Sequence, residues 1–382
     1  MRPSLLILAA LAALAAGCGG TAGNHAKTTR QGTTARSKTT TTRPATTQQA
    51  AVTPFSRPLT RAHLAPGSDP SALPGDVLIA DRSNDRLLVV DPYGRIVWQF
   101  PRPGDLRPGQ SFPVPDDAFF TPDGKQIVAT EEDAFAISVV DVATHRIVYR
   151  YGSVGVAGSG PNQLWNPDDA LMLPDGSLLA ADIKNCRVIL IHPPAHSLAR
   201  SFGSPAQGCV HDPPRAFGSP NGAFPLSNGH YLVTEINGAW VDEMTLSGHV
   251  VRAWHPPGVF YPSDTNEVRP GLYLTAGYES PGVVETFDRR GRLHWRYRPR
   301  SAAGVLDHPS LALPLPNGDV LATDDYHDRV IVIDPRTNRI VWQYGHTGVP
   351  GSAPGYLSQP DGADLVPPHS LAVRLRARMG VP

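Results

Sequence analysis

Residues 162–203 read NQLWNPDDALMLPDGSLLAADIKNCRVILIHPPAHSLARSFG, and this stretch decides the fold. Apolar and polar residues alternate over four short runs, WNPDDALML, SLLAAD, CRVILIH and SLARSF, with Pro, Asp, Gly or Asn at the breaks. Alternation with a period of two predicts half-buried strands, and the residues at the breaks are typical of turns. Four strands in about 42 residues indicate one blade of a β-propeller.

The same unit recurs along the chain. Hexamers that end in an aromatic residue indicate the outermost strand of each blade: RIVWQF at 95–100, RIVYRY at 146–151, SLARSF at 197–202, HVVRAW at 249–254, RLHWRY at 292–297 and RIVWQY at 339–344. Their spacing of roughly 43 to 52 residues is typical of propeller arrays. Innermost strands are predicted to begin at Pro115, Pro167, Pro220, Pro262, Pro309 and Pro360.

The two series are offset by one unit. The unit that begins at Asp76 has no first strand before it, and the strand at Pro360 has no unit after it. We therefore predict an all-β fold, a six-bladed propeller of four-stranded blades, in which residues 363–366 complete the first blade and close the ring. Closure removes the exposed sheet edges at which chains aggregate.

The repeats resemble NHL-type six-bladed propellers of the TolB-like and quinoprotein-like superfamily. The motifs that carry the resemblance are GSGPNQL at 158–164, NPD at 166–168, LPDG at 173–176, AD at 181–182 and NCR at 185–187, with related motifs at 80–86, 323–329 and 351–362. The segment LPLPNG at 313–318 and the run at 330–344 also resemble blades of arylsulfotransferase-like and quinoprotein-like propellers. The resemblance covers about residues 73–376 and implies a fold more than a chemistry, because one fold hosts many functions.

The N-terminus carries a targeting signal. Arg2 precedes an apolar run of about 12 residues, which is too short to span a bilayer, and the run ends at LAAGC, residues 14–18. This resembles a bacterial lipoprotein signal, which implies lipidation of Cys18 and anchoring to the outer face of the cytoplasmic membrane. An ordinary secretory signal cleaved nearby is the alternative. We assign residues 1–18 to the signal, 19–58 to a disordered Thr-rich linker, 59–376 to the propeller and 377–382 to a tail.

Charge and cysteine content narrow the class further. The chain has 382 residues with 34 Lys and Arg against 34 Asp and Glu, a balance that argues against a general nucleic-acid binder. In an oxidising compartment Cys186 and Cys209 are expected to pair, with two free thiols as the alternative. The sequence contains no nucleophile elbow, P-loop, HExxH or dinucleotide fingerprint.

Acids recur where each predicted first strand begins and each second strand ends, so two acidic rings should converge on one face. The first ring supplies the candidate ligand or metal residues Asp116, Asp168, Asn221, Asp264, Asn266, His308 and Asp361, with Asp117, Asp169, Asp307 and Asp364 beside them. Carboxylates and amides suit Ca²⁺ or another divalent cation, and His211, His308 and His327 offer imidazole for Zn²⁺ or acid–base chemistry. The alternative is that the Pro-Asp steps are turn chemistry.

The second ring consists of Asp81, Glu131, Asp182, Glu235 and Asp324, and it is expected to be structural in the three blades that have a matching arginine. Asp81, Asp182 and Asp324 each precede a third-strand arginine, Arg86, Arg187 or Arg329, with which they can pair across strands. Trp98, Trp295 and Trp342 occupy equivalent fourth-strand positions and are expected to pack between blades.

These features favour a binding module that holds an envelope protein, a glycan or a small molecule on one face of the disc, as a monomer. The alternative is a metal-dependent enzyme, lyase-like or lactonase-like, followed by a sulfotransferase-like or quinone-dependent activity. An enzyme needs a compact set of converging ligands, whereas these acids are spread through the repeats, so no catalytic residue is assigned.

Overall fold

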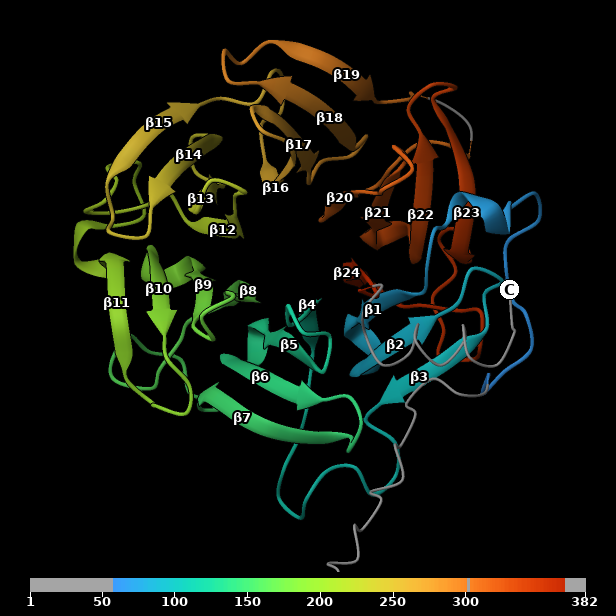
Figure 1. Cartoon of the computed structure of the whole chain (residues 1–382), viewed down its shortest axis with the longest axis horizontal. Coiled ribbons are helices and arrows are strands. Elements are labelled where there is room, and N and C mark those ends of the chain that lie inside the picture. Colours follow the sequence, from blue (N-terminus) through green and yellow to red (C-terminus); the bar gives the residue numbers. More distant parts are fainter. Residues whose placement is uncertain (1–57, 301–302, 368–382) are drawn as a thin grey trace, which may run out of the picture. The chain divides into compact units, whose positions relative to one another are not determined.

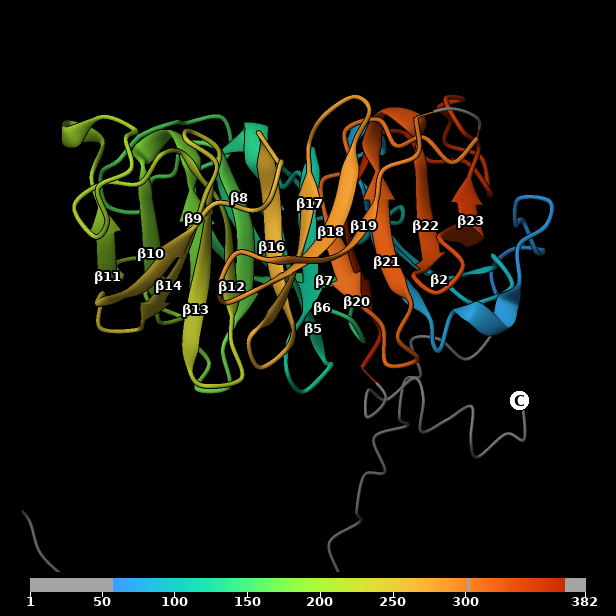
Figure 2. The same cartoon turned by 90° about the horizontal axis from the view of Figure 1, so that it is seen from above.

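The computed structural model describes residues 58–300 and 303–367, and the 24 strands in these ranges form six four-stranded antiparallel sheets. The sheets are arranged as blades around a central axis (Figure 1), and the edge-on view shows the strands crossing the thickness of the disc (Figure 2). The predicted six-bladed, all-β propeller is therefore confirmed. The signal, the linker and the tail lie outside the described residues.

From axis to rim the blades are β24–β1–β2–β3, β4–β5–β6–β7, β8–β9–β10–β11, β12–β13–β14–β15, β16–β17–β18–β19 and β20–β21–β22–β23. Their strands are β1 (Val77–Asp81), β2 (Arg86–Val90), β3 (Ile96–Phe100), β4 (Pro115–Phe120), β5 (Gln126–Glu131), β6 (Ala136–Asp141), β7 (Arg146–Gly152), β8 (Pro167–Met172), β9 (Leu178–Asp182), β10 (Arg187–Ile191), β11 (Leu198–Gly203), β12 (Pro220–Pro225), β13 (His230–Glu235), β14 (Trp240–Thr245), β15 (Val250–Trp254), β16 (Pro262–Arg269), β17 (Leu272–Gly277), β18 (Val283–Asp288), β19 (Leu293–Tyr297), β20 (Ala312–Pro314), β21 (Val320–Asp324), β22 (Arg329–Asp334), β23 (Arg339–Gly345) and β24 (Pro360–Leu365). Five of the six predicted first strands begin at the expected proline, and β20 begins later, at Ala312 instead of Pro309.

The ring closes as predicted. Strand β24 pairs antiparallel with β1, with Leu78 opposite Asp364 and Ile79 opposite Ala363. The outermost strands of the two blades that meet there, β3 and β23, are covered as well. The backbone N–H of Leu59 donates to the carbonyl oxygen of Ile96 in β3, and the backbone N–H of Asp69 donates to that of Val341 in β23. Pairing and covering leave these strands without the exposed edge that would invite another chain.

Indole side chains join neighbouring blades. In each case the indole N–H donates to the turn between the third and fourth strands of the next blade: Trp98 to Val142 O, Trp254 to Arg289 O, Trp295 to Asn338 Oδ1 and Trp342 to Pro92 O. A large apolar side chain whose polar atom finds a partner can be buried at low cost. The predicted inter-blade packing of the tryptophans is confirmed.

The mid-blade acids are structural, as predicted. Asp81, Asp182 and Asp324 are fully buried and accept from Arg86, Arg187 and Arg329 over 2.6, 2.7 and 2.7 Å. A buried charge is tolerated when it is paired and hydrogen-bonded. The expected disulfide between Cys186 and Cys209 is also present.

Candidate functional site

A bulge at the start of the innermost strands turns two successive side chains toward the axis. The ladder shifts register between Pro115 and Ala118 in β4 and between Pro167 and Ala170 in β8, and related shifts occur in β12 and β16. Successive side chains of a regular strand point to opposite faces, whereas a bulge re-aims one of them. The repeated Pro-Asp-Asp sequence therefore builds two stacked rings around the axis.

The upper ring lines a small cavity of about 100 Å³. Its members are the residues that follow the first proline of each blade: Asp116, Asp168, Asn221, Ser263, Ser310 and Asp361. Three blades thus supply carboxylates and the other three supply an amide and two hydroxyls. The neutral half is internally bonded, because the Asn221 amide donates to Ser263 Oγ over 3.0 Å and Ser263 Oγ lies 3.2 Å from Ser310 Oγ.

The lower ring holds a triad of carboxylates, Asp117, Asp169 and Asp264, whose nearest oxygens lie within 4.8 Å of one another. The three side chains are 1%, 0% and 1% exposed. Neither carboxylate oxygen of Asp117 or of Asp264 accepts from an N–H or hydroxyl group of the described residues, and their side-chain hydrogen bonds are with the carboxyls of Asp168 and Asp169. Buried polar atoms are normally paired, so this group of carboxyls needs either shared protons or a bound cation.

Glycines make the room that this triad occupies. A Cβ at Gly362 would lie 2.5 Å from Asp117 Oδ1, and one at Gly222 would lie 2.8 Å from Asp264 Oδ1. Both glycines stand at the lower-ring position of their own blades. A side chain in either place would displace a carboxylate.

An apolar floor closes the axis below the triad. Phe119, Phe224 and Leu311 form a buried cluster against which Leu171 and Leu313 pack, with the two phenyl rings edge to face at 5.3 Å. The axial site is therefore a pocket that opens on one face of the disc. It is not a channel.

The mouth of the pocket is built from residues at the ends of strands. Glu132 follows the acid Glu131, Tyr278 follows Gly277, which stands where other blades carry an acid, and Tyr261 precedes Pro262. Arg82 lies over the acidic half, where its guanidinium donates to Asp116 over 2.5 Å and to Glu132 over 3.0 Å. Among the described residues, Arg82 is the cationic side chain that forms ion pairs with the acids lining the cavity.

Burial and mutual repulsion raise the pKa of the axial carboxyl groups well above the usual range of aspartic acid. Burial is the larger cause and neighbouring carboxylates add to it for Asp117, Asp168, Asp169, Asp264 and Asp325. Burial also raises the pKa of the Tyr261 phenol to about 12. Near neutral pH the charge of these buried carboxylates can be compensated by bound protons or by a bound cation.

The structure gathers some predicted site residues and separates others. Asp116, Asp168, Asn221 and Asp361 line the cavity, and Asp264 lies in the ring below. Asn266 lies further along the same strand, where its amide donates to Ala312 O in the next blade and acts as an inter-blade bridge. His308 stands outside the cavity lining, packed edge to face against Tyr278 and at a tilt against Tyr326, with ring centroids 4.9 and 4.4 Å away.

Several residues of the site were not predicted from the sequence. Ser263 and Ser310 carry no charge, and Tyr261, Tyr278, Glu132 and Asp325 belong to turns. Alignment of the repeats on the first proline identifies the two serines. Alignment on the last residue of the second strand shows that one position is shared by four of these residues, Arg82, Glu132, Tyr278 and Asp325.

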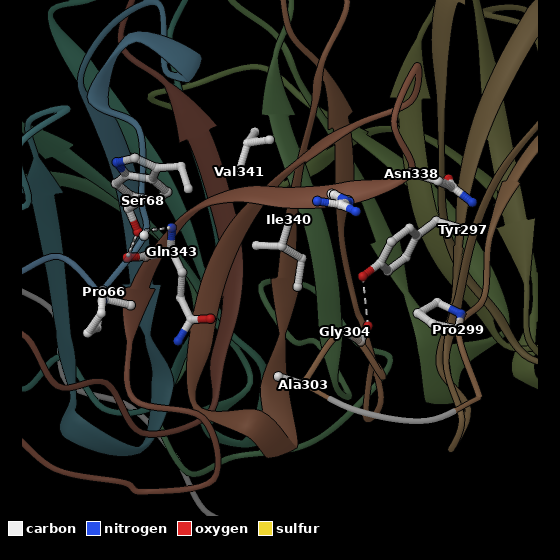
Figure 3. Close-up of a pocket in the computed structure, with 14 residues that line it drawn as sticks. Pro66, Ser68, Tyr297, Pro299, Ala303, Gly304, Asn338, Ile340, Val341 and Gln343 are labelled. Atoms are coloured by element: carbon white, nitrogen blue, oxygen red, sulfur yellow. Dashed lines mark hydrogen bonds between the residues drawn. The ribbon is translucent and has the colours of Figure 1, made fainter.

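A larger cavity of about 450 Å³ lies at the rim, between residues 65–68 and strand β23 (Figure 3). Tyr297 points into it and donates to Gly304 O over 2.8 Å, while Ser68 and Gln343 bond each other on the opposite side. Its walls are mainly backbone and apolar side chains, and Arg339 is the charged residue among those that line it. Converging polar groups favour the axial pocket as the functional site.

No family model and no curated protein sequence matches this chain. Solved structures share the fold. A protein of unknown function from Bacteroides caccae aligns with a TM-score of 0.52 at 16% identity, over 76% of this chain and 98% of that one. A chain of the nidogen/laminin complex aligns with a TM-score of 0.53 at 12% identity, over 76% and 98%.

A catalytically inactive virginiamycin B lyase from Staphylococcus aureus, solved with quinupristin, aligns with a TM-score of 0.48 at 12% identity, over 75% of this chain and 86% of that one. At these identities the Bacteroides caccae and nidogen/laminin structures show a shared fold and say nothing about chemistry. Within residues 58–300 and 303–367 no helix is long and apolar enough to cross a membrane.

Proposed function

We propose that this protein is an exported binding module whose axial pocket holds a divalent cation, and that the cation presents an open coordination position to a ligand on the same face. The observation that carries the proposal is the pair of buried carboxylates Asp117 and Asp264, whose four oxygens accept from no N–H or hydroxyl group of the described residues. Hard cations such as Ca²⁺ take six to eight oxygen ligands at about 2.3–2.6 Å, and the two rings supply oxygens only.

The size of the pocket suits this role. A volume of about 100 Å³ accommodates an ion with about three waters, since each water takes roughly 30 Å³. A ligand that replaces those waters must offer oxygen atoms, as the hydroxyls of a glycan or a small carboxylate do. Tyr261 and Tyr278 at the mouth provide flat surfaces beside the open position.

The test is cation binding by the purified protein. Metal content after dialysis and the midpoint of thermal unfolding are measured with Ca²⁺, with Mg²⁺ and with EDTA, for the natural protein and for the double variant Asp117→Asn/Asp264→Asn. Asp123→Asn is the matched control, because that carboxylate lies on an exposed turn. At a concentration of 100 times the dissociation constant the ion stabilises the fold by about 2.7 kcal/mol.

We expect about one ion per chain and a midpoint that falls when EDTA is added, with both effects lost in the double variant and kept in the control. A natural protein without an ion and without a midpoint shift would overturn the proposal. Screening a glycan array with and without the bound ion then tests the ligand class.

The proposal includes anchoring of the module to the membrane through a lipid on Cys18, a residue that lies outside the described residues. A lipidated chain partitions into the membrane fraction of the producing cell, and Cys18→Ser should release it into the soluble extracytoplasmic fraction. A Cys18→Ser chain that stays in the membrane fraction would contradict the anchor.

An enzyme is the second candidate, because an imidazole stands next to the pocket. His308 Nδ1 lies 2.7 Å from Asp307 Oδ1, an arrangement that orients the ring, and the ring contacts Tyr278 at the pocket wall. A bound ion and an oriented imidazole together can abstract a proton from a carbonyl or lactone substrate. Turnover of such substrates that His308→Ala abolishes without loss of the ion would favour the enzyme.

A further inference from the structure

Blade four carries a second group of buried acids, away from the axial pocket. Glu235 ends β13 and Asp242 lies in β14, and both are 0% exposed. Their nearest oxygens lie within 4.8 Å of each other and of a nitrogen of His211. Apart from a hydrogen bond shared with the Glu235 carboxyl, neither oxygen of Asp242 accepts from a donor among the described residues.

In blades two and five, an arginine of the fourth strand pairs with the buried acid at this position. In blade two Arg150 of β7 stands opposite Ser138 and donates to Glu131, and in blade five Arg296 stands opposite Glu285 and donates to it over 2.6 Å. The equivalent position in blade four is Ala253, which stands opposite Asp242. Two buried acids therefore face each other where the arginine is missing.

The imidazole of His211 takes the place of the guanidinium. Its Nδ1 atom lies 3.1 Å from Glu235 Oε1 and 3.7 Å from Asp242 Oδ2. Ligand atoms bonded to Zn²⁺ at about 2.0–2.2 Å in a tetrahedron are separated by about 3.4 Å. One imidazole and two carboxylates at these separations match three corners of such a tetrahedron.

The loop that carries His211 is fixed on both sides. Cys209, two residues before it, is bonded to Cys186. After it, Asp212 and Ala216 form an antiparallel bridge, closed by an ion pair of 2.6 Å between Asp212 and Arg215. The His211 ring also stacks on Trp240 with centroids 4.1 Å apart, and its side chain is 22% exposed, so the imidazole lies at the boundary between the buried acids and solvent.

We propose that His211, Glu235 and Asp242 bind a divalent transition-metal ion of the Zn²⁺ class, which replaces the cross-strand arginine of the other blades and leaves one position for water or a ligand. Imidazole with carboxylates favours Zn²⁺ over Ca²⁺, whereas the axial oxygens favour Ca²⁺. The two sites are independent in structure, and this proposal stands whether or not the axial pocket holds an ion.

The test titrates Zn²⁺ alone into the metal-free protein by calorimetry and records the visible absorption of the Co²⁺-substituted protein. The variants are His211→Ala, the nearly isosteric Asp242→Asn, and Ala253→Arg, which restores the arginine of blades two and five. His249→Ala is the control, because that side chain is exposed. All are also made in the Asp117→Asn background, which separates the axial pocket from blade four.

We expect one Zn²⁺ per chain at this site, at least tenfold weaker binding in the two ligand variants and in Ala253→Arg, and unchanged binding in the control and in Asp117→Asn. The Co²⁺ protein should show the intense visible bands of a four-coordinate ion. The absence of Zn²⁺ binding by the natural protein, folded ligand variants that bind like the natural protein, or Zn²⁺ lost in Asp117→Asn instead would each overturn the proposal. If a ligand variant does not fold, Ala253→Arg and the Co²⁺ spectrum of the natural protein decide.

Discussion

Removal of the Arg329 guanidinium tests whether the mid-blade acids stabilise the fold. Arg329 is 1% exposed, and its side chain donates to Asp324 over 2.7 Å, to Ala303 O over 3.0 Å and to Val305 O over 2.8 Å. Arg329→Met keeps most of the apolar stem but leaves the carboxylate of Asp324 without this partner. Breaking a buried pair in this way costs about 3–5 kcal/mol when the remaining charge has no other partner, and the His327 imidazole 3.0 Å from the same Asp324 oxygen offsets part of that loss.

The assay is urea unfolding followed by tryptophan fluorescence at pH 7. Arg336→Met is the matched control, because that side chain is 75% exposed and its contacts with Asp334 and Asp319 should contribute less than about 1 kcal/mol. The double variant Arg329→Met/Asp324→Asn removes the charge as well and should recover much of the loss. A single variant that loses under about 1 kcal/mol, or a double variant no more stable than the single one, would refute the structural role of this ring.

Three further predictions concern closure, the disulfide and pH. A chain ending at Ser358 lacks β24 and should aggregate, since β1 is then an open edge, whereas a chain ending at Pro367 should unfold like the natural protein; size-exclusion chromatography compares them. Replacing Cys186 and Cys209 with alanine should cost about 3.5 kcal/mol for a loop of 23 residues in the chain-entropy model, and equal urea midpoints would contradict this. Burial raises the pKa of Asp364 to about 7 despite its backbone hydrogen bonds. Between pH 4 and pH 7 the folded state therefore holds a proton that the unfolded state has lost. The free energy of unfolding should then fall as the pH rises from about 4 to about 7, by at most about 1.4 kcal/mol per pH unit. Asp364→Asn should remove that contribution, and an unchanged pH profile would argue against it.

Repetition explains why so much of the fold could be predicted from sequence. Strand periodicity and turn residues depend on local chemistry, and six copies of one pattern allow each blade to be checked against the others. The offset between the two series of strands also predicted closure by β24, because one unmatched strand stood at each end of the chain. The pairing of Asp182 with Arg187 was likewise visible, since their positions end and begin two adjacent strands.

The site could be predicted only in part, since side-chain direction at a bulge is not a property of the pattern. A strict period of two places only one of Asp116 and Asp117 on the axis, whereas the register shift brings both to it. Asn266 shares its strand with Asp264 but bonds Ala312 of the next blade, because the two side chains meet different neighbours.

The sequence by itself determined the number of blades, the closing strand and the acidic character of one face. These follow from repeats and from residue type, whereas the bond between Cys186 and Cys209 was an expectation with free thiols as the alternative until the structure showed it. Only the tertiary structure decided which of the remaining acids are neutralised by arginine and which are not. That distinction depends on the residue that stands beside each acid, such as Ala253 on the strand adjacent to Asp242, or Gly362, distant in the sequence, beside Asp117. It separates the carboxylates that stabilise blades from those available to bind an ion.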